Sequence, residues 1–396
     1  MCTKIEESQP DISAVCDQCL QWAEDRDYAG YDPYDGLNSP IVNFFARNWL
    51  TRLIGMHAVN KAPINLRTVL KVPKERNPKG IALFAMAYLN RYRETGRGSD
   101  KKQAKKLLKW LEDNQSPGYE QAAWGYNFDW QNARKFFLEA YHPSIVVTVF
   151  GGRAFLEYYE TTGEFWALET AQSAAMFIQK HINRERVNDF DVFTYTPHDS
   201  FVLINTNALA AGFFYQLAAH TDSTKFSERA QELFGFVVDS QADSGGWFYA
   251  MPADESHLSH DNFHTGFVLE SLYGYAMDQP ADHPAPEAYE KGLQFYRDNL
   301  FEENGAPRFE ADKRYPYDAH AAAQAILTFA QRDSAEAQTM AETVSQWAMT
   351  HLFDDNGYFY RRIGRVLNDK TPYMRWSQAW MCRALSRLSL RVAEDS

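Results

Sequence analysis

Apolar residues occupy nearly every position around a helix in six long segments of the chain, which are rich in Ala, Leu and aromatic residues. These segments begin about 55 to 70 residues apart, a spacing typical of repeated helical hairpins. More amphipathic and more charged helical segments alternate with them. The apolar segments span residues 73–95, 141–161, 200–220, 261–277, 317–331 and 371–390; the amphipathic ones span 101–114, 164–181, 225–240, 286–299 and 334–350, with 41–56 or 13–24 as the sixth.

The alternation predicts two concentric layers of helices. A helix that is apolar on all sides is buried on all sides, whereas a helix with one apolar stripe faces solvent on its other side. Each helical pair can bury its apolar face only against neighbouring pairs, so a closed ring leaves no pair with a bare side. An open solenoid is the alternative, and it would expose its two terminal repeats. We therefore predict an all-α fold, an (α/α)6 barrel of six helical hairpins.

Short Gly-aromatic stretches follow the amphipathic helices and support the repeat. The clearest are residues 124–128, 246–249 and 357–360, and residues 190–195 and 305–309 are weaker copies. We expect these stretches to be extended and to lie where the next inner helix begins. One rim of the barrel would then carry aromatic residues together with helix N-termini, whose unpaired N–H groups favour anions.

Length and composition are compatible with one globular unit. Residues 1–60 are expected to form N-terminal helices and a cleft loop that pack on a toroid of residues 61–396, together one domain. With 40 Lys and Arg against 52 Asp and Glu, the net charge is −12, which makes nucleic acid a poor partner. Aromatic residues make up 15% of the chain, a composition common where sugar rings are stacked.

The chain shows no signal for export or membrane insertion. Its first ten residues are polar, and no run of 18 apolar residues occurs. We therefore expect a soluble, cytoplasmic protein. Its four cysteines are too few and too scattered for a disulfide framework, and the pair Cys16 and Cys19 lacks the two further soft ligands that a zinc site needs. We expect no metal and no cofactor.

Polar side chains gather at the starts of the predicted inner helices. Five repeats place them at equivalent positions, so the ring should bring them to one mouth. A concave site lined by acids, imidazoles and aromatic rings is the default hypothesis for an active site. The expected catalytic residues are Asp129, His142, Asp261, His264, Tyr317, Asp318 and His320. The expected substrate-binding residues are Asp32, Tyr34, Asp35, Trp124, Trp130, Arg134, His198, Asp199, Trp247, His260, Tyr373, Arg375, Trp376 and Gln378.

Several of these side chains have a structural alternative. Asp199, Asp261 and Asp318 each precede an apolar run, so each could cap a helix N-terminus instead. Asp32 and Asp35 flank Pro33 in a turn-like string, where Asp commonly bonds its own backbone.

The histidines and Arg375 suggest proton transfer and carboxylate binding. His260 and His264 are four residues apart, which places both on one helix face, and His320 opens the next inner helix. Three imidazoles could hold a metal, but the Glu of a His-Glu-x-x-His helix is missing, so proton transfer is the preferred role. Arg375 could hold a substrate carboxylate through its planar fork, or it could pair with a neighbouring acid.

Particular strings resemble known families. Phe236 and Val237 with Gln241, Gly245 and Trp247 resemble the Gln-Trp repeat of squalene and related terpene cyclases, which ties a helix end to the next loop. The whole chain resembles the six-hairpin glycosidase superfamily and its (α/α) toroid relatives. Residues 31–37, 261–272, 315–326 and 372–380 are similar to an uncharacterised group associated with surface-polysaccharide gene clusters, and residues 200–203 resemble an inner helix of glucuronyl 5-epimerases.

The resemblance to six-hairpin enzymes implies an oligo- or polysaccharide substrate that contains uronic acid, and a glycoside hydrolase, polysaccharide lyase or epimerase. Hydrolysis needs two carboxylates across the glycosidic bond. Elimination and epimerisation need a base, an opposing acid and a cation near the carboxylate. The candidate residues fit both lists, so the choice stays open. A terpenoid-cyclase-like enzyme and a noncatalytic glycan-binding protein are the alternatives.

Overall fold

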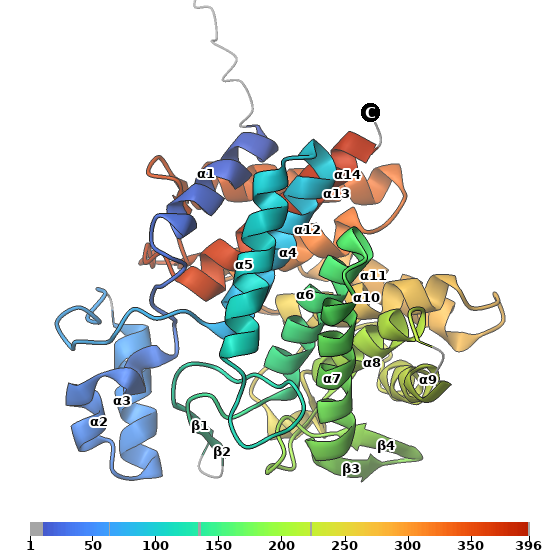
Figure 1. Cartoon of the computed structure of the whole chain (residues 1–396), viewed down its shortest axis with the longest axis horizontal. Coiled ribbons are helices and arrows are strands. Elements are labelled where there is room, and N and C mark those ends of the chain that lie inside the picture. Colours follow the sequence, from blue (N-terminus) through green and yellow to red (C-terminus); the bar gives the residue numbers. More distant parts are fainter. Residues whose placement is uncertain (1–10, 63, 134–135, 222–223, 395–396) are drawn as a thin grey trace, which may run out of the picture.

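The computed structural model describes residues 11–62, 64–133, 136–221 and 224–394 and arranges their helices in two layers (Figure 1). The inner helices are α4 (Pro78–Thr95), α6 (Ile145–Thr162), α8 (Ile204–Ala218), α10 (Asn262–Met277), α12 (Ala319–Ala330) and α14 (Trp380–Glu394), the last preceded by the π-helical segment η3 (Met374–Ala379). The outer helices are α1 (Ile12–Glu24), α5 (Gly98–Asp113), α7 (Phe165–His181), α9 (Thr224–Asp239), α11 (Pro284–Asn299) and α13 (Ala335–His351).

The inner helices form a closed ring. Each inner helix contacts the next one along the chain, and α14 returns to contact α4. Helix α1 packs on α14 and completes the outer layer. The predicted all-α (α/α)6 barrel is therefore confirmed, and the open solenoid is excluded. Of the two segments considered for the sixth outer helix, the one near the N-terminus takes that place.

The first inner helix begins later than predicted, because residues 73–77 precede it in a non-helical conformation. The side chain of Asn77 accepts hydrogen bonds from the backbone N–H groups of Lys79 and Gly80, and Pro78 occupies the first helical turn. An Asn cap followed by Pro is a strong start signal, because Pro has no N–H to leave unpaired there. The helix ends at Gly96, whose φ of 69° is a conformation that glycine adopts without strain.

The described residues contain short strands in two-stranded antiparallel pairs. Strands β5 and β7 lead directly into α8 and α12, and the predicted extended stretches at 190–195 and 357–360 contain β4 and β9. The pairs are β1 (Trp130–Ala133) with β2 (Phe136–Leu138), β3 (Arg184–Val187) with β4 (Phe190–Phe193), β5 (Val202–Leu203) with β6 (Ala250–Met251), β7 (Tyr317–Asp318) with β10 (Arg362–Ile363), and β8 (Phe353–Asp354) with β9 (Tyr358–Phe359).

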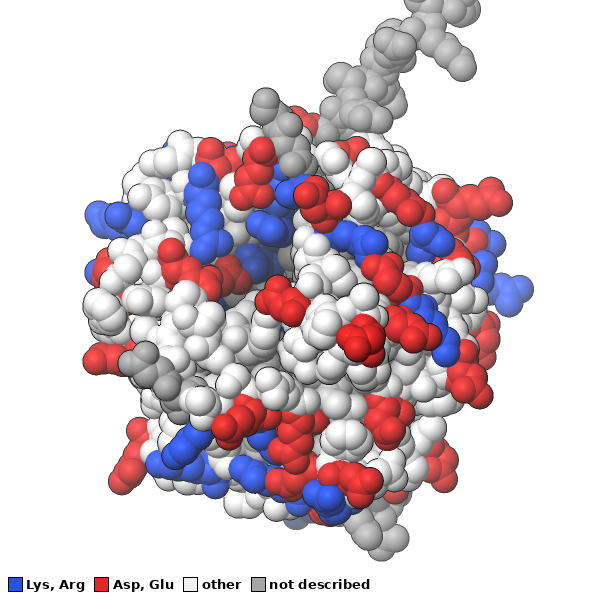
Figure 2. Space-filling view, turned by 90° about the vertical axis from the view of Figure 1, so that its right-hand side faces the viewer, with Lys and Arg blue, Asp and Glu red and all other residues white. Residues whose placement is uncertain are grey.

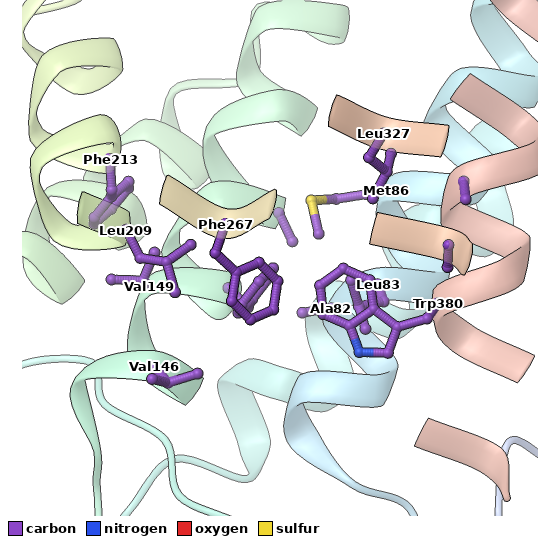
Figure 3. Packing of buried hydrophobic residues seen from close by; sticks show 14 of the residues in the cluster. Ala82, Leu83, Met86, Val146, Val149, Leu209, Phe213, Phe267, Leu327 and Trp380 are labelled. Atoms are coloured by element: carbon purple, nitrogen blue, oxygen red, sulfur yellow. The ribbon is translucent and has the colours of Figure 1, made fainter. Parts of the chain in front are cut away.

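Apolar side chains fill the middle of the ring. Met86 of α4, Phe267 of α10, Leu327 of α12 and Trp380 of α14 lie close together there (Figure 3), and each is at most 4% exposed. Close packing of this kind leaves no open channel along the barrel axis. The two ends of the ring are therefore separate places, each with its own polar groups.

A small helical unit lies beside the ring. It consists of the 3-10 turn η1 (Asp35–Asn38), α2 (Pro40–Phe45) and α3 (Trp49–Lys61), and α3 contacts η1 and β1. Figure 1 shows α2 and α3 at the lower left of the molecule. Phe44, Phe45 and Ile54 remain 63%, 69% and 58% exposed. The division of the chain at residue 60 stays a prediction.

The described helices include none that is long and apolar enough to cross a membrane. Figure 2 shows acidic and basic side chains interspersed over one face of the molecule, including around a hollow in that face. No extended single-sign patch dominates this view.

Candidate active site

Side chains from several repeats meet at the N-terminal end of the inner ring, around the ring of Phe263. The centroid of Phe263 lies 4.1 Å from that of His264, 4.4 Å from that of His320 and 5.8 Å from that of Trp376. These residues belong to the starts of α10, α12 and the η3–α14 segment. Two of the predicted catalytic histidines and one predicted binding tryptophan are thus brought together.

His264 and Asp261 form a hydrogen-bonded pair. Nδ1 of His264 lies 2.8 Å from Oδ2 of Asp261, and Oδ1 of Asp261 accepts the backbone N–H of His264 at 3.1 Å. Asp261 is buried, and the imidazole keeps partial exposure. A carboxylate on Nδ1 fixes the ring and leaves Nε2 as the nitrogen for a substrate. The same carboxylate caps α10, so the capping alternative for Asp261 is confirmed alongside the pair.

His320 is buried and has no polar partner in the described part of the chain. Both ring nitrogens lack a hydrogen bond. The imidazole stacks on Trp380 at 4.3 Å and meets Trp376 edge-on at 4.8 Å. Burial lowers the pKa of His320 well below its usual value, and the charges of Lys79 and Arg375 add to that shift. The ring is therefore a neutral imidazole at neutral pH, and neither nitrogen is engaged by another described group.

Lys79, which was not among the residues predicted from the sequence, places its amino group beside His320. Its Nζ lies 4.3 Å from the ring centroid of Phe150 and 5.0 Å from that of Trp380. The side chain is buried, and among the described residues no carboxylate forms an ion pair with it. Burial lowers the pKa of Lys79 well below its usual value, and Arg375 adds to the effect. Cation–π contacts replace only part of the hydration that an ammonium group loses on burial, so a bound anion would stabilise the charged form of Lys79.

The position of Lys79 follows from the repeat. It stands two residues after the cap Asn77, and Phe263 and His320 stand two residues after the caps Asp261 and Asp318. Side chains two residues past the caps therefore converge around the axis at this end. Aligning the repeats by their caps would have selected Lys79 from the sequence.

Arg375 binds a carboxylate of its own chain. Its Nε and Nη2 donate to the two carboxylate oxygens of Asp32 at 2.6 and 2.8 Å, and both side chains are buried. This is the planar two-point geometry that suits a guanidinium and a carboxylate. Of the two roles considered for Arg375, the structure realises the pair with a neighbouring acid.

Asp35 and Tyr373 belong to a second buried cluster beside that pair. Arg67 donates from Nε to Asp35 at 2.6 Å and from Nη1 to the hydroxyl of Tyr373 at 2.7 Å. Asp35 also accepts the backbone N–H of Asp32 at 2.8 Å, a local turn bond of the kind considered for these aspartates. Burial raises the pKa of Asp35 to about 7, although Arg67 opposes the shift. These contacts hold the 31–38 segment against η3.

Asp318 and Tyr317 lie next to each other in β7 but have different surroundings. Oδ1 of Asp318 accepts the backbone N–H of His320 at 2.9 Å, so it caps α12, and it accepts the indole N–H of Trp376 at 2.8 Å. Burial raises the pKa of Asp318. The Tyr317 ring lies 5.6 Å from Trp347 of outer helix α13, and its hydroxyl contacts Arg314. Tyr317 is therefore turned toward the outer layer.

Tyr34 and Trp130 extend the aromatic wall beyond Trp376. Tyr34 lies 5.7 Å from Trp376 and 5.9 Å from Trp130, which in turn lies 6.1 Å from Tyr195. Tyr34 and Trp130 keep partial exposure. Rings of this kind can stack on a sugar or close over it. Arg134, also predicted to bind substrate, lies outside the described residues.

Other predicted residues lie nearer the rim loops. The rings of His142 and His198 are 5.1 Å apart, and burial with the neighbouring imidazole lowers the pKa of His142. Asp129 accepts the backbone N–H of Ala140 at 2.8 Å. Asp199 accepts the hydroxyl of Thr196 at 2.6 Å and caps no helix. No described hydrogen bond or ring contact joins these groups to His264 or His320.

The expectation that His260 shares a helix face with His264 is wrong, because α10 begins at Asn262 and His260 precedes its cap. The ring of His260 packs against Phe248 at 4.3 Å and Phe295 at 5.3 Å instead. Within the described residues, no three His, Cys, Asp or Glu side chains are grouped to hold a metal ion.

Three predicted binding residues are part of the core. The indole N–H groups of Trp124 and Trp247 donate to the carbonyls of Leu111 and Val237 at 2.9 and 2.8 Å, and both rings are at most 2% exposed. Each ties the end of an outer helix to the following Gly-aromatic stretch. Gln378 is also fully buried and bonds both the N–H and the carbonyl of Phe359. We leave these three residues out of the proposed site, because they offer a sugar almost no surface.

Comparison with known proteins shows which of them share this fold. No protein-family model matches the chain, and no curated protein matches its sequence. The chain is similar in structure to a GH76 alpha-mannanase of Bacteroides thetaiotaomicron, with 12% identity, a TM-score of 0.67, and 99% of each chain covered. It is also similar to a cellobiose 2-epimerase of Bacillus thermoamylovorans, with 12% identity, a TM-score of 0.63, and 81% of this chain and 88% of that one covered.

A polysaccharide lyase is a third structural neighbour, with 11% identity, a TM-score of 0.53, and coverage of 80% of this chain and 90% of the other. The neighbours therefore include an epimerase, a hydrolase and a lyase of carbohydrates. Likeness at these identities establishes architecture and leaves the reaction open. The chain has the (α/α)6-toroid fold of the six-hairpin carbohydrate-active enzymes.

Proposed function

We propose that the chain is an enzyme that removes a proton next to the carboxylate of a uronic acid in an oligo- or polysaccharide, as epimerases and lyases do. The observation that carries the proposal is the grouping of Lys79 with His264 and His320. Lys79 is a buried cation without a carboxylate partner in the described residues, and it lies beside an imidazole with two unpaired nitrogens. A substrate carboxylate would supply the missing negative charge.

The two histidines suit opposite roles in proton transfer. His320 is neutral, so it can accept the proton from the carbon beside the carboxylate. His264 is held by Asp261, and a carboxylate on Nδ1 stabilises the imidazolium that can donate a proton from Nε2. Lys79 would stabilise the negative charge that the carboxylate gains when the proton leaves. Transfer to the opposite face of the carbon inverts it, whereas loss of the adjoining glycosidic oxygen, protonated by His264, gives elimination.

Hydrolysis is less well supported, because the carboxylates at this end of the ring have partners already. Asp32 is bound by Arg375, Asp35 by Arg67, and Asp261 by His264. Asp318 accepts from an indole and a backbone N–H. A glycosidase needs one free carboxyl as acid and a second as base or nucleophile across the bond.

The substrate would lie against the aromatic wall. Tyr34 lies between Trp130 and Trp376 and contacts both, and Tyr34 and Trp130 keep partly accessible surface. Stacking on sugar rings would place the uronate over Phe263, between the two imidazoles. The polar groups needed to orient it come from Lys79 and His264.

The test is a panel of uronate oligosaccharides paired with their neutral counterparts, incubated with purified protein. We expect turnover of at least one uronate and none of its neutral partner. His264→Gln and His320→Gln should each abolish turnover while thermal stability and glycan binding stay close to those of the wild type. His351→Gln is the matched control, because His351 lies at the end of outer helix α13 and bonds the carbonyl of Trp347.

Three outcomes would contradict the proposal. Equal turnover of uronate and neutral substrates would remove the role of Lys79. Full activity of both histidine variants would remove proton transfer by this cluster. Binding without any turnover, in wild type and variants alike, would instead favour a noncatalytic glycan-binding protein.

A further inference from the structure

A second polar cavity lies at the opposite end of the inner ring, where the inner helices end. It encloses about 250 Å³, and all six inner helices contribute to its wall. The apolar side chains that fill the middle of the ring form a plug, and three of them, Met86, Leu327 and Trp380, also line this cavity (Figure 3). The plug therefore separates the cavity from the cluster around Phe263. The proposed reaction makes no use of this cavity.

Three buried polar atoms of its wall have no hydrogen-bond partner among the described residues. They are Nε of Arg153, Oε2 of Glu157 and Nε2 of Gln331. Buried polar atoms without partners are rare, and each costs about 1–3 kcal/mol if it stays unmatched. Two of these atoms are hydrogen-bond donors and one is an acceptor, which defines what a complementary ligand must offer.

Arg153 is held in place from several sides, and its Nη1 lies 4.0 Å from Oε1 of Glu270, which also lines the cavity. Arg153 is 7% exposed, and its Nη2 lies 3.3 Å from the hydroxyl of Ser271 and 3.4 Å from the carbonyl of Leu209. Gly212 makes room for it, because a Cβ there would lie 2.7 Å from Nη2. The guanidinium is thus preorganised, with Nε–H as its unused donor.

Positive charge exceeds negative charge in the wall. Its arginines are Arg93, Arg153, Arg383 and Arg387, and its acids are Glu157, Glu160 and Glu270. Arg383 donates to Oε1 of Glu157 at 2.5 Å, so this ion pair occupies one carboxylate oxygen and leaves Oε2 without a hydrogen-bond donor among the described residues. Glu160 pairs with His220, outside the cavity, at 3.0 Å. A ligand that matches this wall carries negative charge for the surplus guanidinium and at least one hydroxyl for Glu157.

We propose that this cavity binds a small hydroxylated anion, a sugar-sized molecule that carries a carboxylate or a phosphate. The anion would accept from Nε of Arg153 and Nε2 of Gln331, and a hydroxyl would donate to Oε2 of Glu157. The volume is below the range of about 300–1,000 Å³ typical of sites for drug-sized ligands, so the ligand is a monosaccharide derivative or smaller. This site is independent of the proposed reaction.

The experiment measures binding to the full-length protein by isothermal titration calorimetry and thermal shift. The probes are glucuronate, glucose 6-phosphate, inorganic phosphate and neutral glucose. We expect saturable binding of glucuronate or glucose 6-phosphate with a raised Tm, weaker binding of inorganic phosphate, and none of glucose. The first two probes distinguish a carboxylate ligand from a phosphate ligand.

Matched variants locate the bound probe. Arg153→Gln should weaken binding at least tenfold, whereas Arg332→Gln, which removes a surface arginine paired with Glu290, should leave it unchanged. Glu157→Gln should strengthen binding of inorganic phosphate, because it removes a repelling charge, and it remains informative where Arg153→Gln fails to fold. Lys79→Met should leave this binding intact.

No saturable binding of either anionic sugar would overturn the proposal, since water would then be the only occupant. Binding that survives Arg153→Gln but is lost in Lys79→Met would place the probe in the other site and equally overturn it. The absence of binding to this cavity would not contradict the proposed turnover of uronates. Loss of turnover in the histidine variants would likewise say nothing about binding to this cavity.

Discussion

Lys79 is the residue on which the proposed chemistry depends most, and removing its charge should have opposite effects on stability and activity. Lys79→Met keeps the length of the side chain but removes a buried cation that no described carboxylate balances. We expect the free energy of unfolding to rise by on the order of 1–3 kcal/mol and turnover of uronates to be lost. Denaturant unfolding and an activity assay measure the two quantities.

Lys102→Met is the control for Lys79→Met, because Lys102 is exposed on α5. Its effect on stability should stay within about 0.5 kcal/mol. A Lys79→Met protein that is less stable and fully active would show that the lysine serves packing and not substrate.

Asp261 should matter to turnover far more than to folding. Asp261→Asn still offers a side-chain oxygen to cap α10, so we expect a change in stability below about 1 kcal/mol. The amide no longer stabilises an imidazolium at His264, and kcat should fall on the order of 10²- to 10⁴-fold. Steady-state kinetics with a denaturation curve separates the effects, and an unchanged kcat would remove the pair from the mechanism.

His320 should make the protein less stable in acid. The pKa of His320 is lowered in the folded state, so between that value and the unfolded value of about 6.5 the unfolded chain binds more protons. The free energy of unfolding therefore falls as pH drops below about 6.5. Between pH 7 and pH 5 the wild type should lose up to about 2 kcal/mol more than His320→Gln. Urea unfolding at the two pH values measures this difference. If the wild type and His320→Gln lose the same free energy of unfolding between pH 7 and pH 5, the imidazole of His320 is not a neutral buried group.

Residue types and spacing in the sequence selected His264, His320 and Trp376, which do meet around Phe263. Ion-pair partners could not be predicted in the same way, because Arg375 and Asp32 are 343 residues apart in the chain and only the closed ring makes them neighbours. Lys79 escaped notice since a lysine in a first helical turn is usually solvated. Its equivalence to His320 appears only when the caps are aligned.

At the scale of the elements, close packing between Gly151 and Trp124 fixes one inner helix, α6, to a Gly-aromatic stretch. A Cβ on Gly151 of α6 would lie 2.5 Å from the ring of Trp124. Gly151→Ala should therefore cost about 1–3 kcal/mol through overpacking. Gly98→Ala is the matched control, because no atom lies within 4 Å of a Cβ there and alanine favours the helix. Equal stability of the two variants would refute this packing.

Hydrophobic periodicity was sufficient to place eleven of the twelve helices of the two layers, because inner and outer helices differ in how much of their surface is apolar, and it left two segments open for the twelfth. Helix starts were less predictable: the stretch at 73–77 begins with a proline, as a helix start often does, yet it precedes α4 in a non-helical conformation. The roles of Trp124 and Trp247 were also not readable, since an aromatic residue after glycine is equally compatible with stacking on a sugar and with anchoring a loop.

At the scale of the whole molecule, ring closure produces two polar ends separated by an apolar plug. Contact between α14 and α4 brings Arg375 of the last repeat near Lys79 of the first, and the N-terminal segment supplies Asp32 and Tyr34 to the same end. The choice between proton abstraction and hydrolysis could not be made from the sequence, because it depends on which carboxylates are already bonded in the closed ring.

Deuterium incorporation tests the proposed proton abstraction most directly. A uronate oligosaccharide that the protein turns over is incubated with it in heavy water and followed by NMR. We predict deuterium at the carbon beside the carboxylate in the epimerised product, or the unsaturated sugar that elimination leaves, with the wild type and not with His320→Gln. Cleavage to saturated sugars with that carbon still fully protonated would contradict the account.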